Sequence, residues 1–356
     1  MTEGLHSIFR QLNELKGSAS AVKNLLREIQ GQSEQARSEI NISGTKEELI
    51  QNLSRAVGKD YIPLQDVQQL LWDLEEVGKQ HVLLLKRAPE GLADARTNFD
   101  PHEITVALFD DMNVQELFPR YEYPSSGFIW VDFRTAASES WLAKAYGREL
   151  YRQSQGLVST EELDDGTIQE VRQYSWKEVK TTLVANWRGS DEILELRIDI
   201  SNLQTAKTID ERREHLWTLL GPVIRKSDLI GADVDNLLHK LIFERHKPDN
   251  RNRYSIGRVE LTDPRSGQIR VVPHSSEPLD NDEGRKASLR AMQENAFTPS
   301  LVRIEWKSGL PGCPDCMTEP VSVVLEKTSN GPELRILKRI TGATYEYIFD
   351  QLRCRF

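Results

Sequence analysis

The sequence predicts an α+β protein: an N-terminal helical, coiled-coil-like module is followed by a mixed, largely antiparallel sheet body with helices. Two observations predict this class. Apolar residues recur at helical spacing up to about residue 90, and short β-branched and aromatic runs follow one another beyond that point, often without a helix between them. We expect three units, at residues 1–90, 100–205 and 206–356.

The helical module begins with a heptad segment at residues 5–40, where an apolar or small residue recurs at alternating steps of three and four. The members are Leu5, Ile8, Leu12, Leu15, Ala19, Val22, Leu26, Ile29, Ser33, Ala36 and Ile40. Such a repeat forms a continuous seam that a second helix must cover. Because residues 17–20 are weak helix formers, the segment is one long helix or a hairpin of two. The cover comes from the body of the same chain, or from a partner protein or second copy.

The remaining elements follow from local signals. Thr45 and Glu48 form a capping box that starts a second helix, and Pro63 suits the first turn of a third. Runs of β-branched and aromatic residues predict strands at residues 104–109 and 128–133, whereas the spacing of apolar residues predicts a helix at 140–152. Further strands are expected at 169–174, 181–188, 193–200, 255–261, 268–272, 301–307, 321–327 and 333–338, and further helices at 210–220, 233–245, 287–295 and 343–353.

Composition limits the classes of partner. The net charge is −9 and the isoelectric point is about 5.5, so the overall field repels nucleic acid and anionic membranes unless a local patch reverses it. The N-terminus lacks a basic stretch followed by an apolar one, and no apolar run is long enough to span a bilayer. We expect a cytoplasmic protein without a membrane partner, whose three cysteines stay reduced.

One basic segment, residues 240–258, is the candidate nucleic-acid site. It holds six Lys or Arg residues against Glu244 and Asp249, a local charge of +4. Cationic side chains can reach phosphates, and a tyrosine can stack on an unpaired base of DNA or RNA. The candidate binding residues are Lys240, Arg245, Lys247, Arg251, Arg253, Tyr254 and Arg258. The alternative is a solvated helix end, where cations oppose the helix dipole.

A pair of cysteines, Cys313 and Cys316, has the C-x-x-C spacing of a zinc knuckle. A structural zinc needs four ligands, and only Cys354 and His274 remain as candidates to complete the set. A redox pair is a second interpretation, and an inert loop is the simplest. The sequence gives no other reason to expect a cofactor.

A metal-dependent nuclease is the enzymatic alternative. Asp263 and Glu305 could hold Mg²⁺ while Lys307 stabilises charge on the phosphate. The same Glu-x-Lys spacing is common on exposed strands, where it forms an ordinary cross-strand charge pair. Phosphate-binding loops and common hydrolase motifs such as G-x-G-x-x-G, H-E-x-x-H and G-x-S-x-G do not occur.

The sequence as a whole favours a non-enzymatic interaction or adaptor protein. In this hypothesis, residues 5–40 bind a protein partner or a second copy, and the basic segment contacts DNA or RNA. The nuclease remains the alternative hypothesis.

Overall fold

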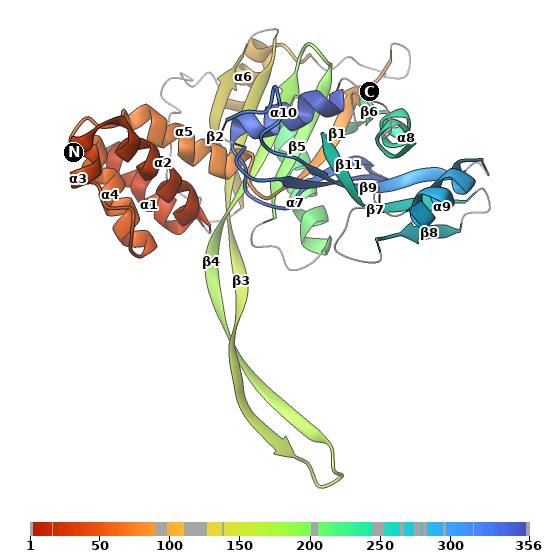
Figure 1. Ribbon diagram of the computed structural model, residues 1–356, viewed down its shortest axis with the longest axis horizontal. Coiled ribbons are helices and arrows are strands. Elements are labelled where there is room, and N and C mark those ends of the chain that lie inside the picture. Colours follow the sequence, from red (N-terminus) through yellow and green to blue (C-terminus); the bar gives the residue numbers. More distant parts are fainter. Residues whose placement is uncertain are drawn as a thin grey trace.

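The predicted α+β class is confirmed by a computed structural model, in which ten α-helices and an 11-stranded sheet are formed by the described residues (Figure 1). Every pairing between the described strands is antiparallel. The described residues are 3–15, 17–89, 98–109, 127–136, 139–200, 206–243, 253–263, 267–273, 279, 283–294, 297–315 and 317–353.

The N-terminal module contains five helices. They are α1 (Glu3–Glu14), α2 (Ser18–Gln32), α3 (Glu34–Glu39), α4 (Lys46–Gly58) and α5 (Leu64–Glu76). The heptad segment is therefore neither one helix nor a two-helix hairpin, because it breaks twice. Gly17 adopts a φ of 81°, which favours glycine, and Ser33 is extended and caps α3 through the Ala36 N–H.

The seam of the heptad segment is covered by the same chain. Leu12, Val22 and Leu26 are fully buried. They share one apolar core with Leu53 of α4 and Leu71 of α5. The sequence left two sources of cover open, and the structure has the intramolecular one. Most of the described apolar residues of the seam are therefore buried within the chain in this conformation.

One sheet joins the rest of the chain. Its strand order is β2-β3-β4-β5-β1-β11-β10-β9-β7-β8, and β6 pairs with β1. The central strand β1 pairs Leu83 with Leu196 on one side and with Glu333 on the other. The strands are β1 (Gln80–Arg87), β2 (Phe128–Thr135), β3 (Trp141–Glu162), β4 (Ile168–Arg188), β5 (Ile193–Asp199), β6 (Leu229–Gly231), β7 (Tyr254–Thr262), β8 (Gln268–Val271), β9 (Thr298–Trp306), β10 (Val321–Thr328) and β11 (Gly331–Ile336).

Two further apolar cores lie against this sheet. The first joins β2 to β5 with α6 (Pro101–Phe109) and α7 (Ala206–Leu220). The second joins β7 to β11 with α8 (Asp235–Phe243), α9 (Glu283–Glu294) and α10 (Gly342–Arg353). The three expected units stay a prediction, because α7 belongs by sequence to the third unit but packs in the first of these cores, and strands from all three units pair in the one sheet.

Two elements differ from the sequence-based expectation. Residues 104–109, predicted as a strand, lie in α6, because Asp100 caps the helix by accepting hydrogen bonds from the N–H groups of His102 and Glu103. Residues 140–152, predicted as a helix, lie in β3. Both faces of that strand are buried at Trp141, Ala143 and Lys144, so its apolar residues do not alternate.

The strands β3 and β4 are 22 and 21 residues long, several times the usual strand length. Only about the inner third of each strand lies in the sheet, because β2 starts opposite Gly147. The rest of the two strands forms a two-stranded ribbon that projects far from the body (Figure 1). We call residues 148–180 the arm. Its tip turns through Gly166, whose φ is 78°.

Candidate functional site

The arm is the candidate site because it projects beyond the other described strands of the sheet. The ladder between β3 and β4 continues from Gly147↔Thr181 to Glu162↔Ile168, where the two strands have only each other as neighbours among the described strands. An isolated two-stranded ribbon is at best marginally stable in water. The two faces of this ribbon are therefore candidate binding surfaces.

The register divides the arm into two faces. Residues directly opposite each other point to the same side, and side chains alternate along each strand. Tyr174 and Trp176 therefore share a face with Ile168, and Leu150, which pairs with Glu178, lies on this face as well. We call it the apolar face.

The apolar side chains on this face are exposed to an unusual degree. Relative exposure is 64% for Leu150, 66% for Ile168 and 65% for Trp176, and Tyr174 is also exposed. The opposite, polar face carries exposed Glu161, Gln169 and Gln173. Exposed apolar side chains that share one face are typical of an interaction surface, and an accessible tryptophan is a common anchor. On this face they alternate with charged residues, because Glu170 and Arg172 lie between Ile168 and Tyr174.

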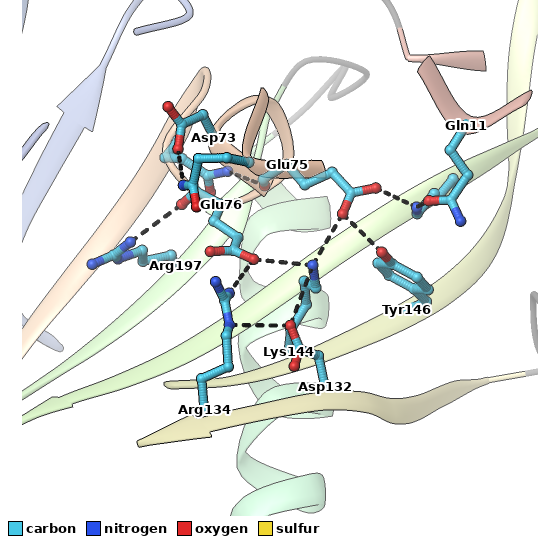
Figure 2. Close-up of polar contacts among 12 residues, drawn as sticks. Gln11, Asp73, Glu75, Glu76, Asp132, Arg134, Lys144, Tyr146 and Arg197 are labelled. Atoms are coloured by element: carbon cyan, nitrogen blue, oxygen red, sulfur yellow. Dashed lines mark hydrogen bonds and ion pairs between the residues drawn. The ribbon is translucent and has the colours of Figure 1, made fainter. Parts of the chain in front are cut away.

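The base of the arm is fixed by a buried charged cluster between the sheet and the helical module (Figure 2). Lys144 and Tyr146 of β3 and Lys180 of β4 follow the alternation of the apolar face. They contact Glu75 and Glu76 at the end of α5. The helical module thus packs on the same side of the ribbon that becomes apolar farther out.

Glu75 is the centre of this charged cluster and is completely buried. It accepts a hydrogen bond of 2.7 Å from the Tyr146 hydroxyl and one of 3.2 Å from the Lys144 ammonium. Lys180 also donates to Glu75, and a second bond from Lys180 reaches the Gln11 amide oxygen on α1. The base of the arm is thereby tied to two helices of the module.

A second carboxylate extends the cluster. Glu76 accepts a hydrogen bond of 3.0 Å from Lys144 and one from Arg134 of β2. The Arg134 guanidinium lies 4.3 Å from the ring centroid of Trp72, a cation–π contact. Asp132 completes the group, with a carboxylate oxygen 3.6 Å from the Lys144 nitrogen.

The electrostatics favour the charged form of the central carboxylate. Burial alone would raise the pKa of Glu75, but the charges of Lys180 and Lys144 outweigh it and lower the pKa to about 2. Burial lowers the pKa of Lys180 to about 8 despite its contact with Glu75. Burial, reinforced by the charge of Glu75, raises the pKa of Tyr146 well above its usual value.

The charged cluster holds α1 and α5 of the helical module against β2, β3 and β4. The charged groups are turned toward one another and shielded from solvent, and paired buried charges of this kind fix orientation more than they add net stability. The consequence is a defined direction for the arm relative to the module.

The basic segment that was expected to bind nucleic acid is only partly described. Arg245, Lys247 and Arg251 lie outside the described residues. Lys240 lies in α8, Arg253 donates a 2.6 Å hydrogen bond to Gln351, and Arg258 pairs with Glu260.

The role expected for Tyr254 is wrong. Its ring is fully buried and packs edge-on against Trp306 at 5.1 Å between centroids, and its hydroxyl donates a 3.0 Å hydrogen bond to the Leu241 carbonyl. The ring therefore cannot stack on a base. The tyrosine belongs to the core because it is the inward-facing first residue of β7.

The structure does not bring the nuclease residues together. Glu305 lies opposite Ser255 at one end of the β7–β9 ladder, whereas Asp263 follows Thr262 at the other end. Eight residues of extended strand separate the two positions by about 26 Å. Asp263 instead accepts a hydrogen bond of 3.1 Å from the Gly267 N–H, at the connection between β7 and β8. Asp263, Glu305 and Lys307 therefore do not form a shared magnesium site.

The zinc prediction stays a prediction. Cys316, Cys354 and His274 lie outside the described residues, and the Cys313 thiol lies 3.2 Å from the Met317 sulfur. Within the described ranges, no group of three or more His, Cys, Asp or Glu side chains is placed to hold a metal ion.

No family model matches the chain, and a search of curated proteins gives no match. No helix in the described part of the chain has both the length and the apolar character needed to cross a bilayer.

Sequence reasoning missed the arm, although a signal for it exists. The strand-forming residues from 141 to 188 are interrupted strongly only at Asp164, Asp165 and Gly166, a tight-turn signal. One hairpin with two very long strands follows from that pattern. The predicted pieces at 169–174 and 181–188 are in fact parts of the single strand β4.

Proposed function

We propose that this chain is a non-enzymatic interaction protein that binds another protein chain through the apolar face of its arm. The observation that carries the proposal is the exposure of Trp176, Leu150 and Ile168 on one face of a ribbon that projects from the body. Aromatic and aliphatic side chains of this kind form the anchors of protein interfaces.

The charge of the arm favours a protein over a nucleic acid. The tip presents exposed Glu161, Glu162, Asp164 and Asp165, which would repel phosphate groups. Binding to nucleic acid through the basic segment gains no support from the described residues, because Tyr254 is buried and Arg258 is paired. The helical module, whose seam is covered, then serves to support the arm.

The proposal can be tested by photo-crosslinking. A photoreactive phenylalanine analogue is placed at position 176 on the apolar face, and in a matched control at position 173 on the polar face. After irradiation in an extract of the source cells, we expect a discrete protein adduct from position 176 and little from position 173. Equal labelling from both positions, or none from either, would contradict the proposal.

A further inference from the structure

The arm has a charge polarity along its length that its apolar face alone does not explain. The outer part, residues 157–171, contains five acidic residues and no Lys or Arg, a net charge of −5. The inner part, residues 148–156 and 172–179, contains four basic and two acidic residues, a net charge of +2. Lys180 is left out because its ammonium is buried in the cluster.

The arm is basic in its inner part and acidic at its tip. Two copies of it are therefore complementary in charge only when they run in opposite directions. Side by side in the same direction, two arms would place two tips of charge −5 together, a repulsive arrangement. In opposite directions, each tip lies along the basic part of the other arm.

We propose that the partner of the arm is a second copy of this chain, and that two arms pack antiparallel through their apolar faces. This inference rests on the proposed function, because it assumes that the apolar face is a binding surface. The arrangement has twofold symmetry, in which the same patch is used by both chains. Trp176 and Leu150, near the base of one arm, then lie toward the outer part of the other, where Ile168 is exposed.

The projection of the arm makes this pairing sterically open. Twelve residues separate Lys180 from Ile168 on β4, which corresponds to about 40 Å of extended strand. In Figure 1 the arm points away from the body, so two antiparallel arms of that length would keep the two bodies at opposite ends of the contact.

The area of the contact predicts a reversible dimer. A ribbon of about 40 Å by about 10 Å offers roughly 400 Å² on one face, so two arms bury roughly 800 Å² in total. Specific, stable interfaces bury about 1,200–2,000 Å². We therefore expect a dissociation constant in the micromolar range, with dimer and monomer exchanging on dilution.

Sedimentation of the full chain across about 1–100 μM tests the proposal. The wild type should change from the mass of one chain, 40.8 kDa, toward twice that value as concentration rises. Trp176→Ser should raise the dissociation constant at least about tenfold, while the matched control Gln173→Ser on the polar face leaves it unchanged. Both substitutions are at exposed positions, so an unchanged circular dichroism melt shows that the fold is kept.

Charge reversal tests the antiparallel direction separately. Reversing the tip with Glu161→Lys, Glu162→Lys and Glu170→Lys changes its charge from −5 to +1 and should weaken the dimer. Reversing the inner part with Arg148→Glu and Arg172→Glu changes its charge from +2 to −2 and should weaken the dimer as well. Combining both sets in one chain should restore association, because each reversed tip again meets an inner part of opposite charge. Failure of the combined variant to regain affinity would overturn the antiparallel arrangement.

A chain that stays monomeric throughout the concentration range, or a dimer indifferent to Trp176→Ser, would overturn self-association. A monomeric chain that still gives a specific adduct from position 176 in an extract would leave the proposed function standing and assign a different protein as partner. A monomeric chain without such an adduct would overturn both the proposed function and the proposed self-association.

Discussion

The hydroxyl of Tyr146, on β3, donates a 2.7 Å hydrogen bond to the carboxylate of Glu75, the penultimate residue of α5. Both side chains are buried. The contact joins β3, just before the arm begins, to the last helix of the N-terminal module. The direction in which the arm projects therefore depends on this contact and on the lysines that share the same carboxylate.

Removing the charge of Glu75 should destabilise the fold. Glu75→Gln keeps the shape of the side chain but leaves Lys144 and Lys180 without their common counter-charge, and we expect a loss of about 3–5 kcal/mol in the free energy of unfolding. Urea denaturation measures the effect. Glu178→Gln is the control, because the pair of Glu178 with Arg148 is exposed and should contribute less than about 1 kcal/mol. Similar losses in both variants would contradict a special role for the buried cluster.

Acid should destabilise the wild type more steeply than Glu75→Gln. The folded chain lowers the pKa of Glu75 from 4.5 to about 2, so the unfolded state binds more protons between these values. The stabilisation is present above about pH 4.5 and is lost as the pH falls toward 2, a change of roughly 3 kcal/mol. Unfolding free energies of both proteins measured from about pH 5 downward test this. The two curves should converge in acid; parallel curves would show that Glu75 is not the group responsible.

A methyl group at position 147 should disturb the root of the arm. A Cβ added to Gly147 would lie 2.3 Å from the Phe128 ring, which packs over the glycine where β2 begins. We expect Gly147→Ala to cost about 1–3 kcal/mol. Gly257→Ala in β7 is the control, because its nearest neighbours would be 3.9 Å away. Thermal melts compare the two, and an equal response would show that the Phe128 ring moves aside freely.

Substituting a buried residue of the heptad segment should lower the stability of the fold without changing the oligomeric state. Leu26 is fully buried in the module core, so Leu26→Ala should cost about 2–5 kcal/mol. Leu25, its partly buried neighbour, should cost less when changed to alanine. Denaturation gives the stability, and light scattering gives the mass. A change of oligomeric state in Leu26→Ala at concentrations where it remains folded would indicate that the seam contacts a second chain after all.

The sequence was informative where local signals agree with burial. The Thr45 capping box is present and starts α4 as predicted, and the helix predicted at residues 343–353 nearly coincides with α10. Prediction was wrong where both faces of an element are covered. β3 packs Trp141 and Ala143 on one core and holds Lys144 in the charged cluster, so its apolar spacing resembled that of a helix.

The site was harder to predict than the fold. Exposure of Trp176 cannot be inferred from residue type, because tryptophan in a strand is usually buried. The charged cluster joins Gln11, Glu75 and Lys180, whose proximity depends on the packing of the module against the sheet. Nothing in their sequence spacing indicates that contact.

The central position of β1 bears on how the chain is synthesised. His81 and Glu333, 252 positions apart, join β1 to β11 through a 2.7 Å contact. At about 5–20 residues per second, a ribosome needs on the order of ten seconds or more to supply the second partner of β1. Throughout that interval the apolar run Val82, Leu83, Leu84 and Leu85 has at least one open edge, because its other neighbour β5 is also made later, and an open edge can pair with other nascent chains. The ladder on that edge of an early strand is therefore completed only when β11, among the last strands made, has left the ribosome.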